Sequence, residues 1–218
     1  MKYFYLLIAG LSLSFSAAAE NYSKVGKEFN IDPLLLRSFA KQESRENPWA
    51  LNINGESCHK NSHSFVIKGE VVYCNSRKST LKILKHISKN PWLLKATLKR
   101  KKHRFWFSSK RHASRFYKKH MSKLSNVKIL RKKTLSTDIG LMQINWKYHN
   151  GSIKNIYKLL DPAFNLHYAA KYYAKLTKKY SAFVAIGKYH NKNNIKRQIR
   201  YRNQVLTIYN KLKGYNNG

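Results

Sequence analysis

The sequence predicts a mainly α-helical fold with a small β part. Residues 22–50 and 137–218 place apolar side chains three and four positions apart, which is the spacing of one helix face. Between them, residues 53–136 alternate short β-branched and aromatic runs with basic or glycine-containing turns. A chain of 218 residues can bury a core, so we expect one domain of α+β class with an insertion at about 53–136.

Residues 1–19 have the composition of a secretory signal peptide. Lys2 supplies a positive start, an apolar run extends from Tyr3 to Phe15, and Ala17-Ala18-Ala19 fits a cleavage site of small residues. An uncleaved anchor helix is less favoured because the run is shorter than the ~20 residues that span a bilayer. We therefore expect residues 20–218 to be the mature domain, either periplasmic or secreted.

Two helices are predicted over residues 22–50, joined at Asn30-Ile31-Asp32. Asp32 is a good N-cap, and Pro33 a good first helical residue. Continuing the apolar stripe of the second helix by three or four residues leads to Glu43. A carboxylate on a core-facing side is costly unless it is neutral or paired, and a general acid has to hold its proton. Glu43 is therefore the candidate acid, although most glutamates within helices are solvated or paired with lysine.

The middle of the chain is expected to mix strands, helices and basic turns. Residues 51–63 are polar and are predicted to form a loop. The elements expected after it are, in order, a hairpin over 64–74 turning at Lys68-Gly69, a helix over 79–89, two strands within 92–107 around the turn 99–102, a basic helix over 109–124 and a strand over 127–130.

Residues 137–218 are predicted to return to helix. Asp161-Pro162 repeats the cap-and-proline start seen at Asp32-Pro33. A shorter apolar helix is expected from Ala182 to His190, and a basic amphipathic helix over 194–212 closes the chain.

The two cysteines, Cys58 and Cys74, lie in one segment of a chain that we expect to be exported. A disulfide between them would close a loop of about 16 residues, which is worth about 3 kcal/mol in the chain-entropy account. The alternative is a zinc site with His59 and His63, but no tight Cys-x-x-Cys pair is present. We expect the disulfide, no metal site and no cofactor.

The chain carries 44 lysines and arginines against nine acidic residues, a formal charge of +35. Such a charge attracts polyanions. For an exported chain we expect anionic cell-envelope polymers as partners and no specific nucleic acid. The aromatic residues among the basic ones have two interpretations, a nucleic-acid surface or an ordinary core beneath a solvated face, and we prefer the second. These aromatic residues are Phe105, Trp106, Phe107, Phe116 and Tyr117.

Three short segments carry residues suited to sugar chemistry. They are Gln42-Glu43-Ser44, Gly140-Leu141-Met142-Gln143-Ile144-Asn145 and Tyr189-His190-Asn191. The Gln143 amide can both donate to and accept from sugar groups, Met142 can pack on a sugar face, and the Tyr189 phenol can hold Glu43. Taken singly, each residue is better explained by a structural role, Gly140 in a turn and Met142 and Tyr189 in the core.

Taken in order, the three segments resemble the motifs of the lytic transglycosylases with an SLT-type catalytic domain, which has a lysozyme-like fold. The resemblance covers residues 22–50 and 136–212. This family often has Tyr-Asn where this chain has Tyr189-His190. In that respect the chain is similar to the small specialised enzymes that work with secretion, conjugation and pilus systems. The resemblance therefore implies a secretion, conjugation or pilus apparatus as a candidate partner. It implies Glu43 as the catalytic residue and the following substrate-binding residues: Ser44, Met142, Gln143, Asn145, Tyr189 and His190.

The resemblance implies an enzyme that cleaves the β-1,4 bond between N-acetylmuramic acid and N-acetylglucosamine in peptidoglycan and leaves a 1,6-anhydro end. Most glycosidases use two carboxylates. Asp138 is the best second candidate here, but no second acid is compelling, and a single-acid mechanism fits that scarcity. Two alternatives stay open: a lysozyme-type muramidase that hydrolyses the same bond, and a basic glycan- or DNA-binding protein without activity.

Overall fold

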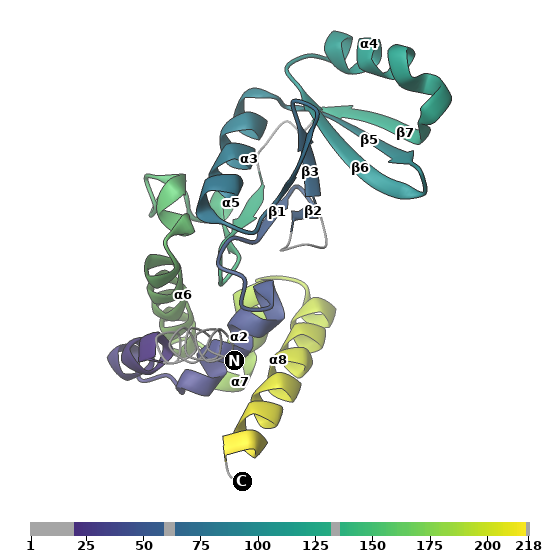
Figure 1. Ribbon diagram of the computed structural model, residues 1–218. Helices are drawn as coiled ribbons and strands as arrows, with labels where there is room; N and C mark the ends of the chain where they lie inside the picture. The colour runs from purple at the N-terminus through teal and green to yellow at the C-terminus, as the bar shows by residue number, and fades with distance from the viewer. Residues whose placement is uncertain (1–19, 59–63, 132–135, 217–218) are drawn as a thin grey trace, which may run out of the picture. The chain divides into compact units, whose positions relative to one another are not determined.

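The computed structural model describes residues 20–58, 64–131 and 136–216 (Figure 1). Two compact units make up this part of the chain. The helical unit comprises residues 20–46 and 163–216, and the mixed unit comprises residues 47–162. The predicted signal peptide, residues 1–19, and the two histidines of the alternative zinc site, His59 and His63, lie outside the described residues.

The helical unit starts with the two helices that the sequence predicts. Residues 20–29 are helical, and α2 spans Pro33–Ser44. The turn between them is tight, because a Cβ on Gly26 would lie 2.6 Å from the backbone oxygen of Ile31. Asp32 accepts a hydrogen bond of 2.8 Å from the backbone N–H of Leu34, which confirms the predicted cap.

The later helices of this unit pack around one phenylalanine of α2. They are α6 (Pro162–Thr177), α7 (Ala182–His190) and α8 (Ile195–Asn216). The ring centroid of Phe39, a fully buried residue, lies 5.2 Å from that of Tyr173 and 4.9 Å from that of Tyr189. Helix α8 contacts both α2 and α7. Aromatic packing of this kind therefore fixes the end of α2 that carries Glu43.

A four-stranded sheet in the mixed unit corrects two sequence predictions. Its strands are β1 (Leu51–Ile53), β2 (Glu56–Cys58), β8 (Thr137–Ile139) and β9 (Ile144–Asn145), in the order β2-β1-β8-β9 with antiparallel pairing. The prediction of a loop over 51–63 was wrong for residues 51–58, because Asn54 and Gly55 take positive φ (51° and 85°) and turn β1 into β2. Residues 59–63 lie outside the described residues. Residues 137–145 were also wrongly predicted to be helical.

A five-stranded sheet forms the larger β part of the mixed unit. Its order is β4-β3-β6-β5-β7, and the β3–β6 pair is parallel. The strands are β3 (Ser64–Ile67), β4 (Glu70–Tyr73), β5 (Trp92–Leu98), β6 (Lys101–Phe107) and β7 (Ser125–Arg131). The two predicted hairpins are confirmed, with Lys68-Gly69 and Lys99-Arg100 in the left-handed conformation that such turns require.

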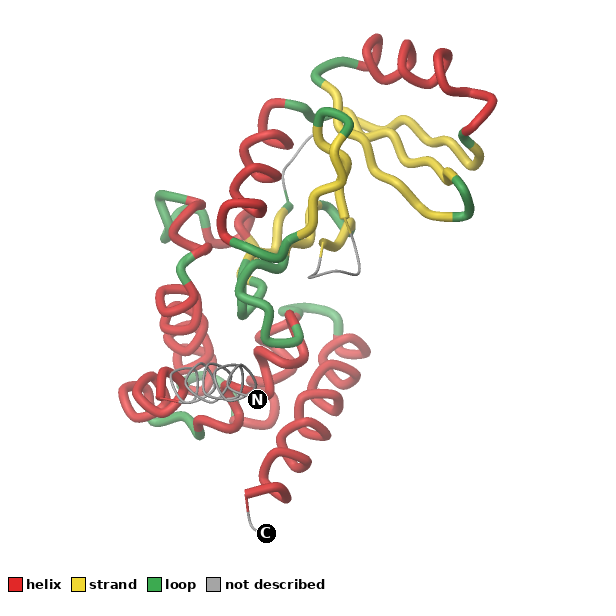
Figure 2. Tube along the Cα trace, in the orientation of Figure 1, coloured by secondary structure: helices red, strands yellow, loops and turns green. Residues whose placement is uncertain are grey.

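Helices accompany the sheets of this unit, and among the residues that the structure describes, strands occur only within 51–145 (Figure 2). They are α3 (Arg77–Lys89), α4 (Lys110–His120), a 3-10 turn η1 (Met121–Lys123), α5 (Trp146–His149) and a second 3-10 helix η2 (Ile156–Leu160). The Phe116 ring of α4 lies 4.9 Å from Phe105 and 5.3 Å from Phe107. These three rings pack on one another but are half-buried, and of the five aromatic residues named above only Trp106 is buried.

Two links join β2 to the five-stranded sheet. The disulfide Cys58–Cys74, with a Cα–Cα distance of 5.6 Å, is present as predicted. Glu56, whose side chain is 8% exposed, forms ion pairs with Lys95 of β5 and Arg104 of β6. The covalent link and the ion pairs together hold the edge of the small sheet.

The predicted class is confirmed: the chain is mainly α-helical with small sheets, as expected of a lysozyme-like fold. Within the described residues, no helix combines the length and the apolar composition that crossing a bilayer requires.

Candidate active site

Glu43 lies in the last turn of α2, with a side chain that is only 14% exposed. The helix ends directly after it, because Arg45 takes the left-handed conformation (φ 57°) and its N–H bonds back to the helix. Phe39, one turn earlier, is fully buried. The stripe that predicted a core-facing carboxylate at this position is therefore present in the structure.

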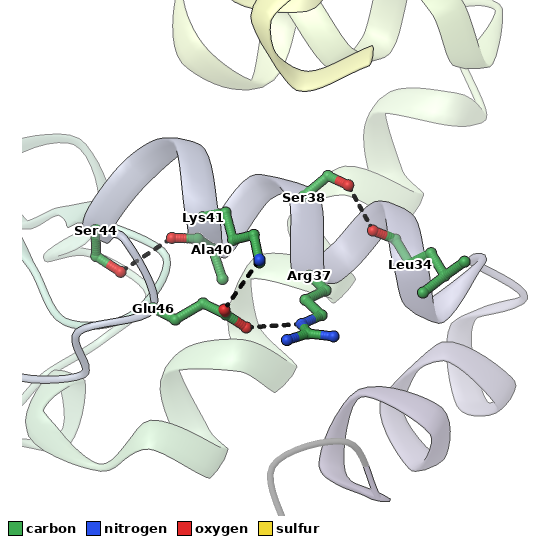
Figure 3. A network of polar contacts seen from close by, with 7 residues as sticks. All are labelled: Leu34, Arg37, Ser38, Ala40, Lys41, Ser44 and Glu46. Atoms are coloured by element: carbon green, nitrogen blue, oxygen red, sulfur yellow. Dashed lines mark hydrogen bonds and ion pairs between the residues drawn. The ribbon is translucent and has the colours of Figure 1, made fainter. Parts of the chain in front are cut away.

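The two glutamates near the end of α2 have different partners. Glu46 accepts a hydrogen bond of 2.9 Å from Arg37 Nε and has Lys41 Nζ 3.7 Å away (Figure 3). Among the described residues, no lysine or arginine lies within ion-pair distance of the Glu43 carboxylate. The neighbouring titratable side chain is His190, with Nδ1 3.9 Å from Oε1. Glu46 is thus neutralised by cations, whereas Glu43 is not.

Tyr201, which the sequence analysis missed, adjoins Glu43. The pKa of Tyr201 is raised well above its usual value, first by burial and then by the charge of Glu43, by Tyr189 and by hydrogen bonding toward Glu43. Its hydroxyl is buried and, in the described part of the chain, has no partner with full hydrogen-bond geometry. Tyr201 therefore keeps its proton and offers a donor next to the carboxylate.

His190 is held flat against Tyr201. The two rings stack with centroids 4.5 Å apart and an interplanar angle of 5°. Tyr189, the preceding residue, packs on Phe39 instead, so the two residues of this motif have different roles. A ring clamped in this way can present only one edge, and Nδ1 is the atom nearest to Glu43.

Close packing of α7 on α8 brings these rings together. A Cβ on Gly187 would lie 2.8 Å from Cβ of Gln198 and 2.9 Å from its backbone oxygen, so only glycine fits at this point. Asn191, the last residue of the third motif, builds the turn between the helices. Its side-chain oxygen accepts from the N–H groups of Asn193 (3.1 Å) and Asn194 (2.8 Å).

Ser44 points into its own helix. It is 1% exposed, and its hydroxyl donates to the backbone oxygen of Ala40 at 3.1 Å (Figure 3). The hydroxyl proton of Ser44 is therefore already used in a hydrogen bond within the helix. The substrate contact that the resemblance implies for Ser44 stays a prediction.

The Gly-Leu-Met-Gln motif forms the turn between β8 and β9. Gly140 (φ 80°) and Gln143 (φ 46°) both take the left-handed conformation. The Gln143 side-chain nitrogen donates to the backbone oxygens of Ala50 (3.1 Å) and Gly140 (2.9 Å). Met142 is 1% exposed and belongs to the core. Since Gln143 uses its nitrogen to brace the turn, its amide oxygen is the atom suited to accept from a ligand.

A row of polar residues crosses the four-stranded sheet. Ser57, Asn52, Asp138 and Asn145 lie opposite one another on successive strands, and directly opposed residues share one face. Asn145 donates to Asp138 Oδ1 at 2.6 Å. In the described part of the chain, the side-chain oxygens of Asn52 and Asn145 are buried without a partner. Native buried acceptors are nearly always satisfied, so this row is suited to an added donor.

The nine acidic residues can be compared for a second catalytic carboxylate. Asp138 is engaged by Asn145, Glu56 by two cations and Glu46 by Arg37. In the described residues, no group of three or more histidine, cysteine, aspartate or glutamate side chains could hold a metal ion. The structure thus brings together Glu43, Tyr189 and His190 in the helical unit, and Met142, Gln143 and Asn145 in the mixed unit.

Comparison with known proteins adds one match. A family described as the transglycosylase SLT domain matches residues 110–218, which is half of the chain. The matched residues include the Gly140–Asn145 turn and Tyr189-His190, whereas Glu43 precedes them. No curated protein and no solved structure matches the chain.

Proposed function

This chain belongs to the family of transglycosylase SLT domains, and we propose that it is an exported lytic transglycosylase of peptidoglycan with Glu43 as its acid and base. The family makes it an enzyme of transglycosylase type that acts on peptidoglycan. The observation that carries the finer proposal is the state of Glu43, a poorly exposed carboxyl group without a lysine or arginine partner in the described structure.

One carboxyl group is enough for the proposed reaction. Glu43, protonated when substrate binds, gives its proton to the glycosidic oxygen as the bond to C1 of N-acetylmuramic acid breaks. The acetamido group or the ring oxygen of the sugar stabilises the positive charge that develops at C1. Glu43, now a carboxylate, takes the proton of the C6 hydroxyl as that oxygen attacks C1. The product is a 1,6-anhydro sugar, no water is added, and Glu43 regains its proton.

Tyr201 and His190 are placed to stabilise Glu43 at the stage when it is a carboxylate. Between the two proton transfers Glu43 is a carboxylate in a largely buried position, and such a group needs donors or a positive charge. The Tyr201 phenol stays protonated and lies beside it, and His190 Nδ1 is 3.9 Å away. We assign both as positioning residues that support Glu43 after it has given up its proton.

Three of the other acids are engaged elsewhere, which supports a mechanism with one carboxylate. Glu28 pairs with His167, Glu70 with Lys82, and Asp32 caps α2. Asp138 is better suited to the polar row of the mixed unit, where it accepts from Asn145. We propose that this row, with the amide oxygen of Gln143, holds hydroxyl and acetamido groups of the glycan.

The setting is part of the same proposal. Residues 1–19 would direct export to the periplasm or beyond, and 20–218 would act as one lysozyme-like domain with its insertion at about 53–136. A secretion, conjugation or pilus apparatus would be the machine served. What supports this setting is the composition of the N-terminus and the Tyr189-His190 pair.

The test compares Glu43→Gln with Glu46→Gln in the mature chain. Removal of a general acid typically costs about 100- to 10,000-fold in rate, so Glu43→Gln should release almost no soluble product from purified sacculi. Glu46→Gln removes a neighbouring carboxylate and should keep most of the activity. Circular dichroism has to show that both variants are folded. Near-normal turnover by folded Glu43→Gln would sink the assignment.

A further inference from the structure

The sheet and helix of residues 92–131 form a segment without acidic residues. It contains fourteen lysines and arginines and no aspartate or glutamate. Lys95 and Arg104 are neutralised by Glu56 of β2. For the other twelve, no carboxylate lies within ion-pair distance in the described part of the chain.

The fold places these charges outward. Helix α4 packs on β5, β6 and β7 through Ala113, which is fully buried, and Phe116 (Figure 1). Its other side exposes Arg111, Arg115 and Lys119. These three lie four residues apart, so they follow one line along the helix with a rise of about 6 Å between successive charges.

Two further groups of exposed cations belong to the same sheet. The β5–β6 turn exposes residues 99–102, which are all lysine or arginine, and the edge strand β7 exposes Lys128 and Arg131. The strand register puts Arg131 on the side of the sheet that α4 covers and Lys128 on the other side. We name the exposed cations of the turn and α4, together with Arg131, the basic face. Like charges so close together repel one another, and a bound polyanion removes that repulsion and releases counterions.

We propose that the basic face binds the carboxylates of the peptide chains of peptidoglycan and holds the enzyme on its polymer at a site separate from the bond that is cleaved. The inference rests on the proposed function, which makes peptidoglycan the substrate. The basic face binds the anionic peptides of the polymer, whereas the catalytic residues bind its sugars.

Peptide carboxylates fit this face better than single-stranded nucleic acid does. Binding of single strands uses exposed aromatic rings on which bases stack. Here Phe105, Phe107 and Phe116 are half-buried and pack on one another. The face therefore offers exposed charge and only partly exposed rings, which suits carboxylates carried by a flexible, repetitive polymer.

The test is sedimentation of the mature chain with purified sacculi on ice, over a range of salt concentrations. The variant Arg111→Gln/Arg115→Gln/Lys119→Gln removes three charges from α4. The matched control, Arg197→Gln/Arg200→Gln/Lys211→Gln, removes the same residue types from exposed positions of α8. The same three proteins are also tested for binding to sacculi whose carboxylates have been amidated and for binding to duplex DNA.

We expect the α4 variant to bind native sacculi about tenfold more weakly at low salt, with the difference vanishing as salt rises. The α8 control should stay within about twofold of wild type, and on amidated sacculi all three proteins should bind weakly and alike. Equal losses in the two triple variants, or binding unchanged by amidation, would overturn the proposal. Tighter, α4-dependent binding of DNA than of sacculi would assign the face to nucleic acid instead.

Turnover of short glycan strands freed of peptides separates this inference from the proposed function. The α4 variant should cleave them as fast as wild type, because they lack the carboxylates. If neither protein cleaves them or intact sacculi, the proposed function fails, whatever the binding data show. If both cleave them and only the sedimentation result is negative, the inference alone fails.

Discussion

Replacing Gly187 with alanine tests whether the contact between α7 and α8 builds the surroundings of Glu43. The added Cβ would lie 2.8 Å from Cβ and 2.9 Å from the backbone oxygen of Gln198. Carbon atoms pack at about 3.5–4.0 Å, so the helices have to separate by roughly 0.7 Å. His190 follows three residues later on α7, and Tyr201 three residues after Gln198 on α8, so the separation would loosen their stack.

The magnitude follows from two opposing effects. Overpacking of this kind costs about 1–3 kcal/mol, and alanine recovers up to about 1 kcal/mol of helix propensity. Gly214→Ala in α8 is the matched control, because nothing lies within 4 Å of its added Cβ. The difference in stability between the two variants therefore isolates the overpacking cost. For a chain of this size, each kcal/mol of that cost lowers Tm by about 2–4 °C.

The assay is thermal unfolding of both variants, with rates on sacculi measured below the transition. Gly187→Ala should melt below Gly214→Ala and should lose activity even where it is folded. A Gly187→Ala protein as stable and as active as Gly214→Ala would refute the claim that this contact sets the position of His190 and Tyr201.

Three further predictions concern stability and the surroundings of the acid. Cys58→Ser should lower the free energy of unfolding by about 3 kcal/mol, measured in urea, and wild type under reducing conditions should show the same loss. For Glu56, burial raises the pKa, but the hydrogen bonds and charges of Lys95 and Arg104 outweigh it and hold the pKa below its usual value. The contribution of these ion pairs to the free energy of unfolding should be fully present at pH above the pKa of Glu56 in the unfolded chain, about 4.3. It should be lost as the pH falls through the lower pKa of Glu56 in the folded chain. A Glu56→Gln protein whose stability falls by the same amount over that pH range would contradict this. His190→Leu should lower kcat about tenfold with the fold intact, and His190→Asn should recover part of it; equal rates for the two would exclude a polar role.

Local sequence signals predicted the helices well. Asp32-Pro33 fixed the start of α2, because an N-cap acceptor and a preset proline φ act within one turn. Lys68-Gly69 located one hairpin, but the same kind of signal at Asn54-Gly55 was overlooked in the polar run 51–63. An asparagine-glycine pair between alternating residues is the strongest short-range hairpin signal, so β1 and β2 were within reach of the sequence.

Other features depend on contacts that no local pattern contains. Strands β8 and β9 are too short to show a period. Strand β8 is specified by pairing with β1, more than 80 residues earlier, and β9 by pairing with β8. Tyr201 shares a buried stripe with Gln198 and Val205, but nothing in that stripe shows that it meets Glu43. Glu56 likewise looks like a solvated turn residue until Lys95 and Arg104 are placed beside it.

The most direct test of the central claim is to digest sacculi with the mature chain in oxygen-18 water and to identify the products by mass spectrometry. The account predicts 1,6-anhydro ends without oxygen-18, produced by wild type and absent with Glu43→Gln. Reducing ends that carry one oxygen-18 atom would contradict it, because they would show that water, and not the C6 hydroxyl, attacks C1.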